Sequence, residues 1–210
     1  MLSIETLVTF LSASFLIGIA PGPDNLFVLT VSAANGKRAG VWVTFGLCTG
    51  LLGHTAAVVL GVAAVLQASP IAFTALQLIG AGYLAYLAWG AFRSNPRSLD
   101  GELGQTKLDA WHLYRRGIVM NITNPKVSMF FLAFLPQFVD SSQEGTTMQI
   151  LFLGALFMLM TLIVFGGVAL LAGQLGAFFR RSPRSQVVMN RVAGVVFLAL
   201  ATKLLLDSVG

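Results

Sequence analysis

The sequence predicts an all-α integral membrane protein. Three observations support this: the composition, the length of the apolar segments and the distribution of basic residues. Of 210 residues, 56% are hydrophobic and only 10% are charged, whereas soluble globular chains carry roughly 25% charged residues. Because a helix needs about 20 apolar residues to cross a bilayer, the chain can form five or six crossings but no separate soluble domain.

Six apolar segments are predicted to span the membrane, each bounded by charge, proline or a small polar cluster. They cover residues 7–34, 39–66, 71–92, 117–139, 147–172 and 192–206. No basic residue precedes the first segment, which we therefore expect to be kept as a span instead of being cleaved as a secretory signal. The longest polar stretch, 93–116, separates a first three-helix repeat (1–92) from a second (117–210).

The basic residues predict the orientation, because loops rich in Lys and Arg stay in the cytoplasm. Eleven of the thirteen follow spans one, three and five, and none lies at the N-terminus or in the loops after spans two and four. Both termini are thus expected to be periplasmic and the 93–116 loop cytoplasmic. Topology also explains the net charge of +5 without a nucleic-acid partner.

An odd number of spans per half gives the two halves opposite orientations, as in the inverted repeats of many secondary transporters. Proline, which breaks or kinks helices, occurs in corresponding places. Pro21 and Pro23 lie in span one, and Pro125 and Pro136 lie in span four, the first span of each half. Interrupted helices at matching positions point to a transporter binding site, although kinks that serve packing alone are the alternative.

Both interrupted spans carry residues that are costly to place in a bilayer. Asp24 is the only acid well inside a span, and Lys126 is the only base placed comparably deep. Counted from Lys37 and Arg116 at about 1.5 Å per residue, the two charges lie roughly 20 Å and 15 Å from the cytoplasmic ends. They are therefore expected at similar heights, where a pair of opposite charges relieves part of each desolvation cost.

Two interpretations of this pair remain open: a buried salt bridge that fixes the two halves together, and a substrate site. The helix breaks favour the second, since backbone groups released in a membrane must face a cavity or a ligand. Exposed helix N-termini favour a carboxylate and unwound carbonyls favour a cation, so a small zwitterion suits the site.

His54 lies in the outer half of span two, where it serves either as a proton relay or as a hydrogen-bonded packing residue. Gly46, Gly50 and Gly53 in the same span, with further glycines in spans three and five (Gly80, Gly82, Gly90, Gly166, Gly167, Gly173, Gly176), are typical of close helix packing. The single cysteine, Cys48, excludes an internal disulfide, and two histidines leave no metal cluster.

Several motifs resemble the LysE/RhtB family of amino-acid exporters, over the whole chain. They are Pro21-Gly22-Pro23 in span one, Gly46-x-x-Thr49-Gly50-x-x-x-His54 in span two, and Asn121-x-x-Asn124-Pro125-Lys126 with Phe134-Leu135-Pro136-Gln137-Phe138 in span four. The resemblance implies export of amino acids or close derivatives, such as homoserine, threonine or homoserine lactone, from the bacterial cytoplasm, driven by the proton gradient.

The sequence is thus interpreted as a multi-pass transporter of the bacterial inner membrane, with a small amino-acid substrate, protons and the lipid bilayer as its partners. Pro21, Gly22 and Pro23 open the first helix, and Asn25, Asn121 and Asn124, next to Pro125, offer uncharged hydrogen bonds. Asp24 and Lys126 bind charge or protons, and coupling falls to Asp24 or His54.

Efflux of a metal or another inorganic ion is the alternative, although it usually needs several carboxylate, thiol or imidazole ligands. No cofactor or resident metal is expected. A membrane enzyme is disfavoured because no nucleophile and base occur together in motif spacing. The oligomeric state, a homo-oligomer included, stays open.

Overall fold

The computed structural model describes residues 2–62, 70–94, 109–140, 145–181 and 183–209, and within these ranges every regular element is a helix. The first half contains α1 (Ile4–Ile19), α2 (Pro23–Asn35), α3 (Lys37–Ala57), a π-helical turn η1 (Val58–Val62) and α5 (Pro70–Arg93). The second half contains α6 (Ala110–Ile122), α7 (Pro125–Met129), the π-helical η2 (Phe130–Phe134), the 3-10 helical η3 (Leu135–Phe138), α8 (Thr146–Arg181) and α9 (Pro183–Val209).

The interruptions predicted in spans one and four are confirmed. The helices α1 and α2 meet at an angle of 58°, and α6 meets the segment Pro125–Phe138 at 50°. Four other helical segments, Lys37–Gly61, Thr74–Arg93, Thr146–Gln174 and Arg184–Leu206, are long and apolar enough to cross a membrane. The described residues therefore provide four crossings, or up to six if each bent pair is one span.

Several helices extend beyond the predicted segments. The stretch 93–116 is not a loop throughout, since α6 begins at Ala110, and α9 begins at Pro183 instead of residue 192. In both places the extra turns carry exposed arginines, Arg115 and Arg116 in α6 and Arg184 and Arg191 in α9. A hydropathy profile ends a span where charges begin, but a helix continues when its charged side chains face outward. Residues 63–66 of the predicted second span lie outside the described residues.

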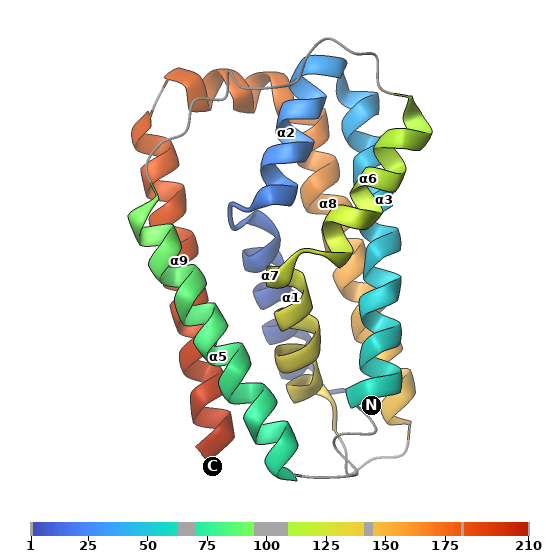
Figure 1. Cartoon of the computed structure of the whole chain (residues 1–210), viewed down its shortest axis with the longest axis vertical. Coiled ribbons are helices and arrows are strands. Elements are labelled where there is room, and N and C mark those ends of the chain that lie inside the picture. Colours follow the sequence, from blue (N-terminus) through green and yellow to red (C-terminus); the bar gives the residue numbers. More distant parts are fainter. Residues whose placement is uncertain (1, 63–69, 95–108, 141–144, 182, 210) are drawn as a thin grey trace.

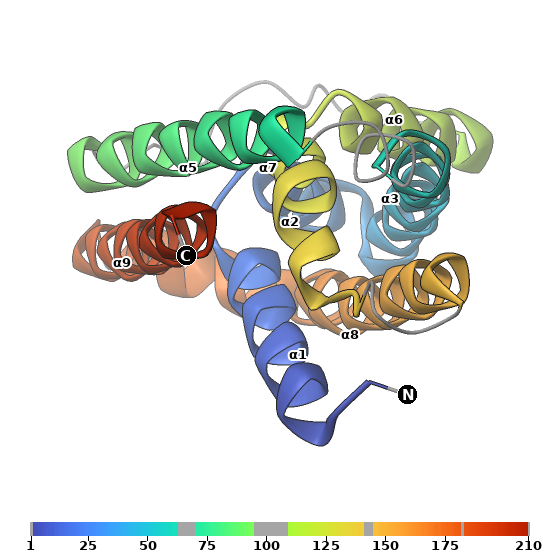
Figure 2. The ribbon, with the colours of Figure 1, turned by 90° about the horizontal axis from the view of Figure 1, so that it is seen from below.

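The helices form a bundle with two distinct ends (Figure 1). The turn from α2 to α3, the end of α5, the start of α6 and the corner between α8 and α9 lie at one end, and the start of α1 and the end of α9 lie at the other. Along the bundle, α3 packs against α6 and α8, while α5 packs along α9 (Figures 1 and 2). The short helix α7 lies near the middle, close to the break between α1 and α2.

Glycines allow the closest helix contact, between α3 and α6. A Cβ atom on Gly46 would collide with the Tyr114 carbonyl, and one on Gly117 would collide with the Val43 carbonyl. A Cβ atom on Gly50 would lie 2.7 Å from Oδ1 of Asn121 on α6. The backbones of α3 and α6 therefore touch with no room for a side chain between them.

The predicted packing role of the glycines is confirmed only in part. It holds for Gly46, Gly50 and Gly80, each of which faces another helix closely, but not for Gly53, whose Cβ would come no nearer than 4.0 Å to a neighbour. It is wrong for the glycines that have open space around them, namely Gly82, Gly90, Gly166, Gly167 and Gly173. The surroundings of Gly176 lie outside the part of the chain that the structure describes.

We expect Gly46→Ala to destabilise the protein by about 1–3 kcal/mol, because the added methyl group forces α3 and α6 apart. Gly53→Ala is the matched control on the same helix, since its Cβ would come no nearer than 4.0 Å to Ile122. Thermal melting in detergent should show a lowered melting temperature for the first variant only. Equal melting temperatures for both variants would contradict the tight α3–α6 contact.

Candidate functional site

The break between α1 and α2 follows from the missing N–H group of Pro21. In an uninterrupted helix, residue 21 would donate to the carbonyl of Ile17, but proline has no backbone donor. The ammonium of Lys126 replaces it, with Nζ donating to the Ile17 carbonyl at 3.2 Å and to the Ala20 carbonyl at 3.0 Å. A cation at a helix C-terminus is also favoured by the helix dipole, so Lys126 completes the end of α1 from another part of the chain.

The other side of this break carries the acid. Pro23 is the first residue of α2 and Asp24 the second, a position where the helix dipole favours a negative charge. Asn25 Nδ2 donates to the Gly18 carbonyl at 2.7 Å and ties the start of α2 to the end of α1. A glycine at position 22 lets Lys126 approach, because a Cβ atom there would lie 3.0 Å from Nζ.

The break in span four is built in the same way. Pro125 cannot donate to the carbonyl of Asn121, four residues earlier, and that carbonyl accepts instead from the Asn124 N–H at 3.0 Å and from His54 Nε2 at 3.1 Å. A carbonyl oxygen can only accept, so Nε2 of His54 carries the proton. The imidazole also packs against Phe131, with ring centroids 5.5 Å apart.

Each half therefore donates a hydrogen bond to a carbonyl in the other half that lies four residues before a proline. Lys126 of the second half binds the Ile17 carbonyl, and His54 of the first half binds the Asn121 carbonyl. The local sequences also correspond, because Gly22-Pro23-Asp24 and Asn124-Pro125-Lys126 each place a proline first and a charged residue second in a helix.

Asn124 connects the acid to the base. Its Oδ1 accepts from the backbone N–H of Lys126 at 3.0 Å and caps α7, while its Nδ2 donates to Asp24 Oδ2 at 2.8 Å. The hydrogen bonds of Asp24 and Lys126 thus go to different partners, and within the described part of the chain no direct hydrogen bond joins the carboxylate to the ammonium. All three side chains are buried, with Asp24 and Asn124 3% exposed and Lys126 6%.

Three buried oxygens of this site have no hydrogen-bond partner among the described residues: Asp24 Oδ1, Asn25 Oδ1 and Asn121 Oδ1. Buried polar atoms are nearly always hydrogen-bonded, and those that are not call for an explanation. All three can only accept, but the Asn121 oxygen faces Gly50 of α3. Asp24 Oδ1 and Asn25 Oδ1, on neighbouring residues at the α1–α2 break, are the pair suited to a ligand that brings hydrogen-bond donors, as a primary ammonium does.

The structure brings the ten residues selected from the sequence together at the two breaks. At the first break, Asn25 and Lys126 donate to carbonyls at the end of α1. Asn124 links the two breaks through its hydrogen bond to Asp24. His54 lies at the second break, where it donates to the Asn121 carbonyl. Sequence reasoning did not find the backbone carbonyls of Ile17 and Ala20 or the ring of Phe131, because no residue type marks a carbonyl that has lost its donor. The one sequence signal for such a carbonyl is the proline itself, because the carbonyl that loses its donor lies four residues before it.

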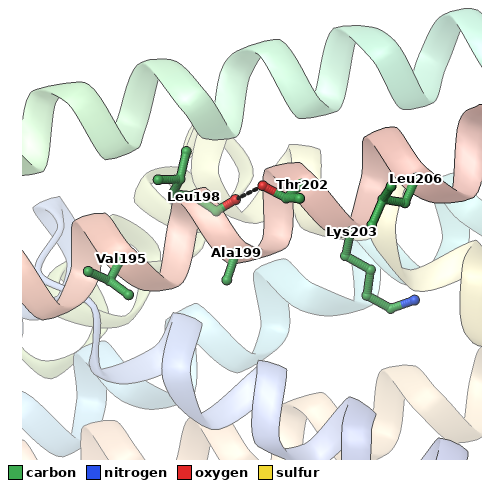
Figure 3. A pocket seen from close by; sticks show the side chains of 6 residues that line it. All are labelled: Val195, Leu198, Ala199, Thr202, Lys203 and Leu206. Atoms are coloured by element: carbon green, nitrogen blue, oxygen red, sulfur yellow. Dashed lines mark hydrogen bonds between the residues drawn. The ribbon is translucent and has the colours of Figure 1, made fainter.

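A shallow groove on α9 is distinct from this buried site (Figure 3). Its lining consists of Val195, Leu198, Ala199, Thr202, Lys203 and Leu206. The Thr202 hydroxyl donates to the Leu198 carbonyl at 3.0 Å, and none of the ten residues belongs to the groove. Elsewhere, the described ranges contain no group of three or more His, Cys, Asp or Glu side chains placed to hold a metal ion.

The bond from Lys126 to Ile17 can be tested by giving the backbone its donor back. Lys126→Met should lower the melting temperature, since a buried unsatisfied carbonyl costs about 1–3 kcal/mol. Adding Pro21→Ala should recover part of this loss, because the substituted residue has an N–H group that can donate to the Ile17 carbonyl. Pro23→Ala is the control, since Lys126 does not bind the carbonyl four residues before Pro23. If both alanine substitutions act additively with Lys126→Met, then Lys126 does not replace the missing donor.

Comparison with known proteins places the chain in a family. Residues 14–208 match the model of the LysE type translocator family. A membrane protein of Pseudomonas aeruginosa, called uncharacterized, is 29% identical over 97% of this chain and 96% of its own. A homoserine/homoserine lactone efflux protein of Salmonella typhimurium is 30% identical over 97% of both chains.

A further relative, an uncharacterized membrane protein of Vibrio cholerae, is 30% identical over 94% of this chain and 95% of its own. No solved structure matches the chain. The family and the names of these relatives indicate a transporter and not an enzyme. The match extends over nearly the whole chain and agrees with the apolar helices of the fold, and the protein is therefore a multi-pass membrane protein that belongs to the LysE type translocator family.

Proposed function

We propose that this protein exports small amino acids, or derivatives that keep the amino group, from the bacterial cytoplasm across the inner membrane in exchange for protons. The observation that carries the proposal is the buried Asp24–Asn124 pair at the meeting point of two broken spans. A primary ammonium supplies three donors, which suits the unpartnered oxygens of Asp24 and Asn25 at the α1–α2 break.

The opposite end of an amino acid also finds partners in this site. The ammonium of Lys126 lies against Gly22, and the first backbone N–H groups of α2 have no partner within their own helix. Both favour a carboxylate or a carbonyl oxygen. Because Lys126 is itself cationic, the site is less suited to a bare metal ion, which remains the alternative substrate.

The Salmonella typhimurium relative is named for homoserine and homoserine lactone. Both compounds carry an amino group and at least one oxygen acceptor, so both fit the donor and acceptor arrangement of the site. We take them, with threonine, as the first candidate substrates of this chain.

We further propose that the chain crosses the membrane six times as two inverted repeats, 1–92 and 117–210, with both termini in the periplasm. The matching Pro-Asp and Pro-Lys segments and the reciprocal hydrogen bonds of His54 and Lys126 support the repeats. The orientation is supported by basic residues of the elements that begin at the end of the bundle where α2 turns into α3 (Figure 1). Lys37 and Arg38 open α3, Arg115 and Arg116 lie in α6, and Arg184 lies in the first turn of α9.

Proton coupling is assigned to Asp24, because its Oδ1 has no hydrogen-bond partner among the described residues and can bind a proton while Oδ2 keeps its bond from Asn124. Proton binding from the periplasm would discharge the acid and weaken its hold on the substrate ammonium. Proton release to the cytoplasm would restore the charge that attracts the next substrate. His54 is the second candidate, although its Nε2 proton is engaged by the Asn121 carbonyl.

The orientation predicts the behaviour of two reporter fusions. A reporter after Gly210 should be active in the periplasm, and one inserted near Gly101 should be active in the cytoplasm. Alkaline phosphatase and green fluorescent protein, which function on opposite sides of the membrane, provide the two readouts. Finding both insertion points on one side would refute the six-span arrangement.

The coupling predicts a specific defect for Asp24→Asn. Inverted vesicles with an acidic interior should accumulate labelled homoserine through the wild-type protein and lose this accumulation when the pH gradient is collapsed. The Asp24→Asn protein should show only downhill movement that ignores the gradient, because the amide cannot carry a proton. Glu5→Gln, at an exposed acid in the first turn of α1, is the matched control and should retain coupling.

Two outcomes would contradict the proposal. Gradient-driven accumulation by Asp24→Asn moves the coupling elsewhere, with His54→Gln as the next substitution. Wild-type vesicles that take up a divalent metal but none of a panel of labelled amino compounds would favour ion efflux instead.

A further inference from the structure

Two glutamine amides lie away from the Asp24 site and lack a full set of partners. Gln77 on α5 is only 4% exposed, and it forms no hydrogen bond within the described part of the chain. Gln137 in η3 donates from Nε2 to the Ala133 carbonyl at 2.9 Å, but its buried Oε1 has no partner among the described residues. Neither residue takes part in the hydrogen bonds of the two helix breaks.

The packing of α5 on span four places the two amides at the same level. Gly80 of α5 lies against Ala133, and a Cβ on Gly80 would come 2.5 Å from that of Ala133. The helices run in opposite directions at this contact (Figure 1). Gln77 lies about one turn before Gly80, and Gln137 four residues after Ala133, so both lie on the same side of the contact, toward the end where α5 begins (Figures 1 and 2).

This level is separated from the Asp24 site along span four. Gln137 follows Lys126 by eleven residues, or roughly 16 Å at a helical rise of about 1.5 Å per residue. Packed phenylalanines occupy the interval, with the ring of Phe130 5.1 Å from Phe134 and 4.8 Å from Phe157. The amides therefore lie beyond an apolar layer, on the side opposite the basic end of the bundle.

An unpartnered buried amide is costly, since loss of its hydrogen bonds to water is not compensated. The same end of the molecule contains a glutamine that avoids this cost. Gln149 accepts from the Asp140 N–H at 2.9 Å through Oε1 and donates to the Asp140 carbonyl at 3.1 Å through Nε2. The contrast shows that a glutamine near this end can be satisfied by the protein itself, whereas Gln77 and Gln137 are not.

We propose that Gln77 and Gln137 form a second, outward polar subsite that binds the substrate after it leaves the Asp24 site. This inference rests on the proposed export function and adds a second binding position on the exit side. An amide both donates and accepts. The amide oxygens can therefore accept from the amino group of the substrate, and the amide NH₂ groups can donate to its carbonyl oxygen. Because the amides carry no charge, they bind the substrate without competing with Asp24 for its ammonium.

The test replaces each amide by an apolar side chain of similar size. Gln77→Leu should raise the melting temperature in detergent by about 2–4 °C, because it removes a buried amide that forms no hydrogen bond among the described residues. Gln137→Leu should change it less, because it removes the unpartnered Oε1 but also the hydrogen bond from Nε2 to the Ala133 carbonyl. The same variants should lower the initial rate of labelled homoserine uptake into inverted vesicles about tenfold, and homoserine lactone serves as the second probe. Gln137→Met, whose unbranched side chain is closer in shape to glutamine, is the second variant at this position.

Gln149→Leu is the matched control, and it should show the opposite pattern. Loss of its two hydrogen bonds to Asp140 should lower the melting temperature while uptake per folded molecule is kept. A gain in stability together with a loss of transport is therefore specific to the proposed subsite, since a structural role predicts that the two quantities fall together.

The possible failures are distinguishable. Wild-type uptake that is unchanged by both Gln→Leu substitutions overturns the subsite and leaves the export function standing. A fall in stability that accounts for the lost uptake also overturns it, since the amides are then structural. Wild-type vesicles that take up no labelled amino compound overturn the proposed function and this inference with it.

Discussion

The arrangement of the protein depends on one constraint: a backbone carbonyl inside a membrane must find a donor, and proline takes that donor away. In water such a carbonyl would be hydrated, but in the hydrocarbon region an unsatisfied group costs several kcal/mol. Pro21 creates the need at Ile17, and Lys126 meets it. The Asn121 carbonyl, to which Pro125 cannot donate, accepts from the Asn124 N–H of its own half and from His54 of the other half. Because Lys126 and His54 each come from the opposite half, these hydrogen bonds bring both breaks to the same place.

This constraint also explains why ionisable groups are stable at this depth. The ammonium of Lys126 binds two carbonyls at the end of α1, and the carboxylate of Asp24 lies at the start of α2 and accepts from Asn124. The charges are thus balanced first by helix termini and amides, and the acid and the base do not neutralise each other directly. An acid held in this way keeps one oxygen for a substrate or a proton, which a direct salt bridge would have occupied.

Much of the fold could be predicted from the sequence, because apolar length and proline positions are local signals. The breaks in spans one and four follow from Pro21, Pro23 and Pro125, and the match of α5 (Pro70–Arg93) to the predicted segment 71–92 follows from hydropathy. The start of α6 at Ala110 could not be read in this way, since exposed arginines resemble a loop in composition.

The contacts within the site were less accessible to sequence reasoning. The sequence pairs Asp24 with Lys126 because opposite charges attract, but the hydrogen-bond partner of Asp24 is Asn124. Whether a lysine binds an acid or two carbonyls depends on the angle between α1 and α2, which no local pattern encodes. The same holds for Gln77 and Gln137, whose neighbours are set by the close contact of Gly80 with Ala133.

The reciprocal hydrogen bonds have a consequence for the order of biosynthesis. Lys126 is translated about one hundred residues after Pro21, which at roughly 5–20 residues per second takes about 5 to 20 s. During this interval the carbonyls of Ile17 and Ala20 have no partner, so the first span cannot settle alone in lipid. We expect it to stay beside the insertion machinery, or close to water, until the fourth span emerges. The nascent chain thus completes its first membrane helix only after the first span of its second half has begun to enter the bilayer.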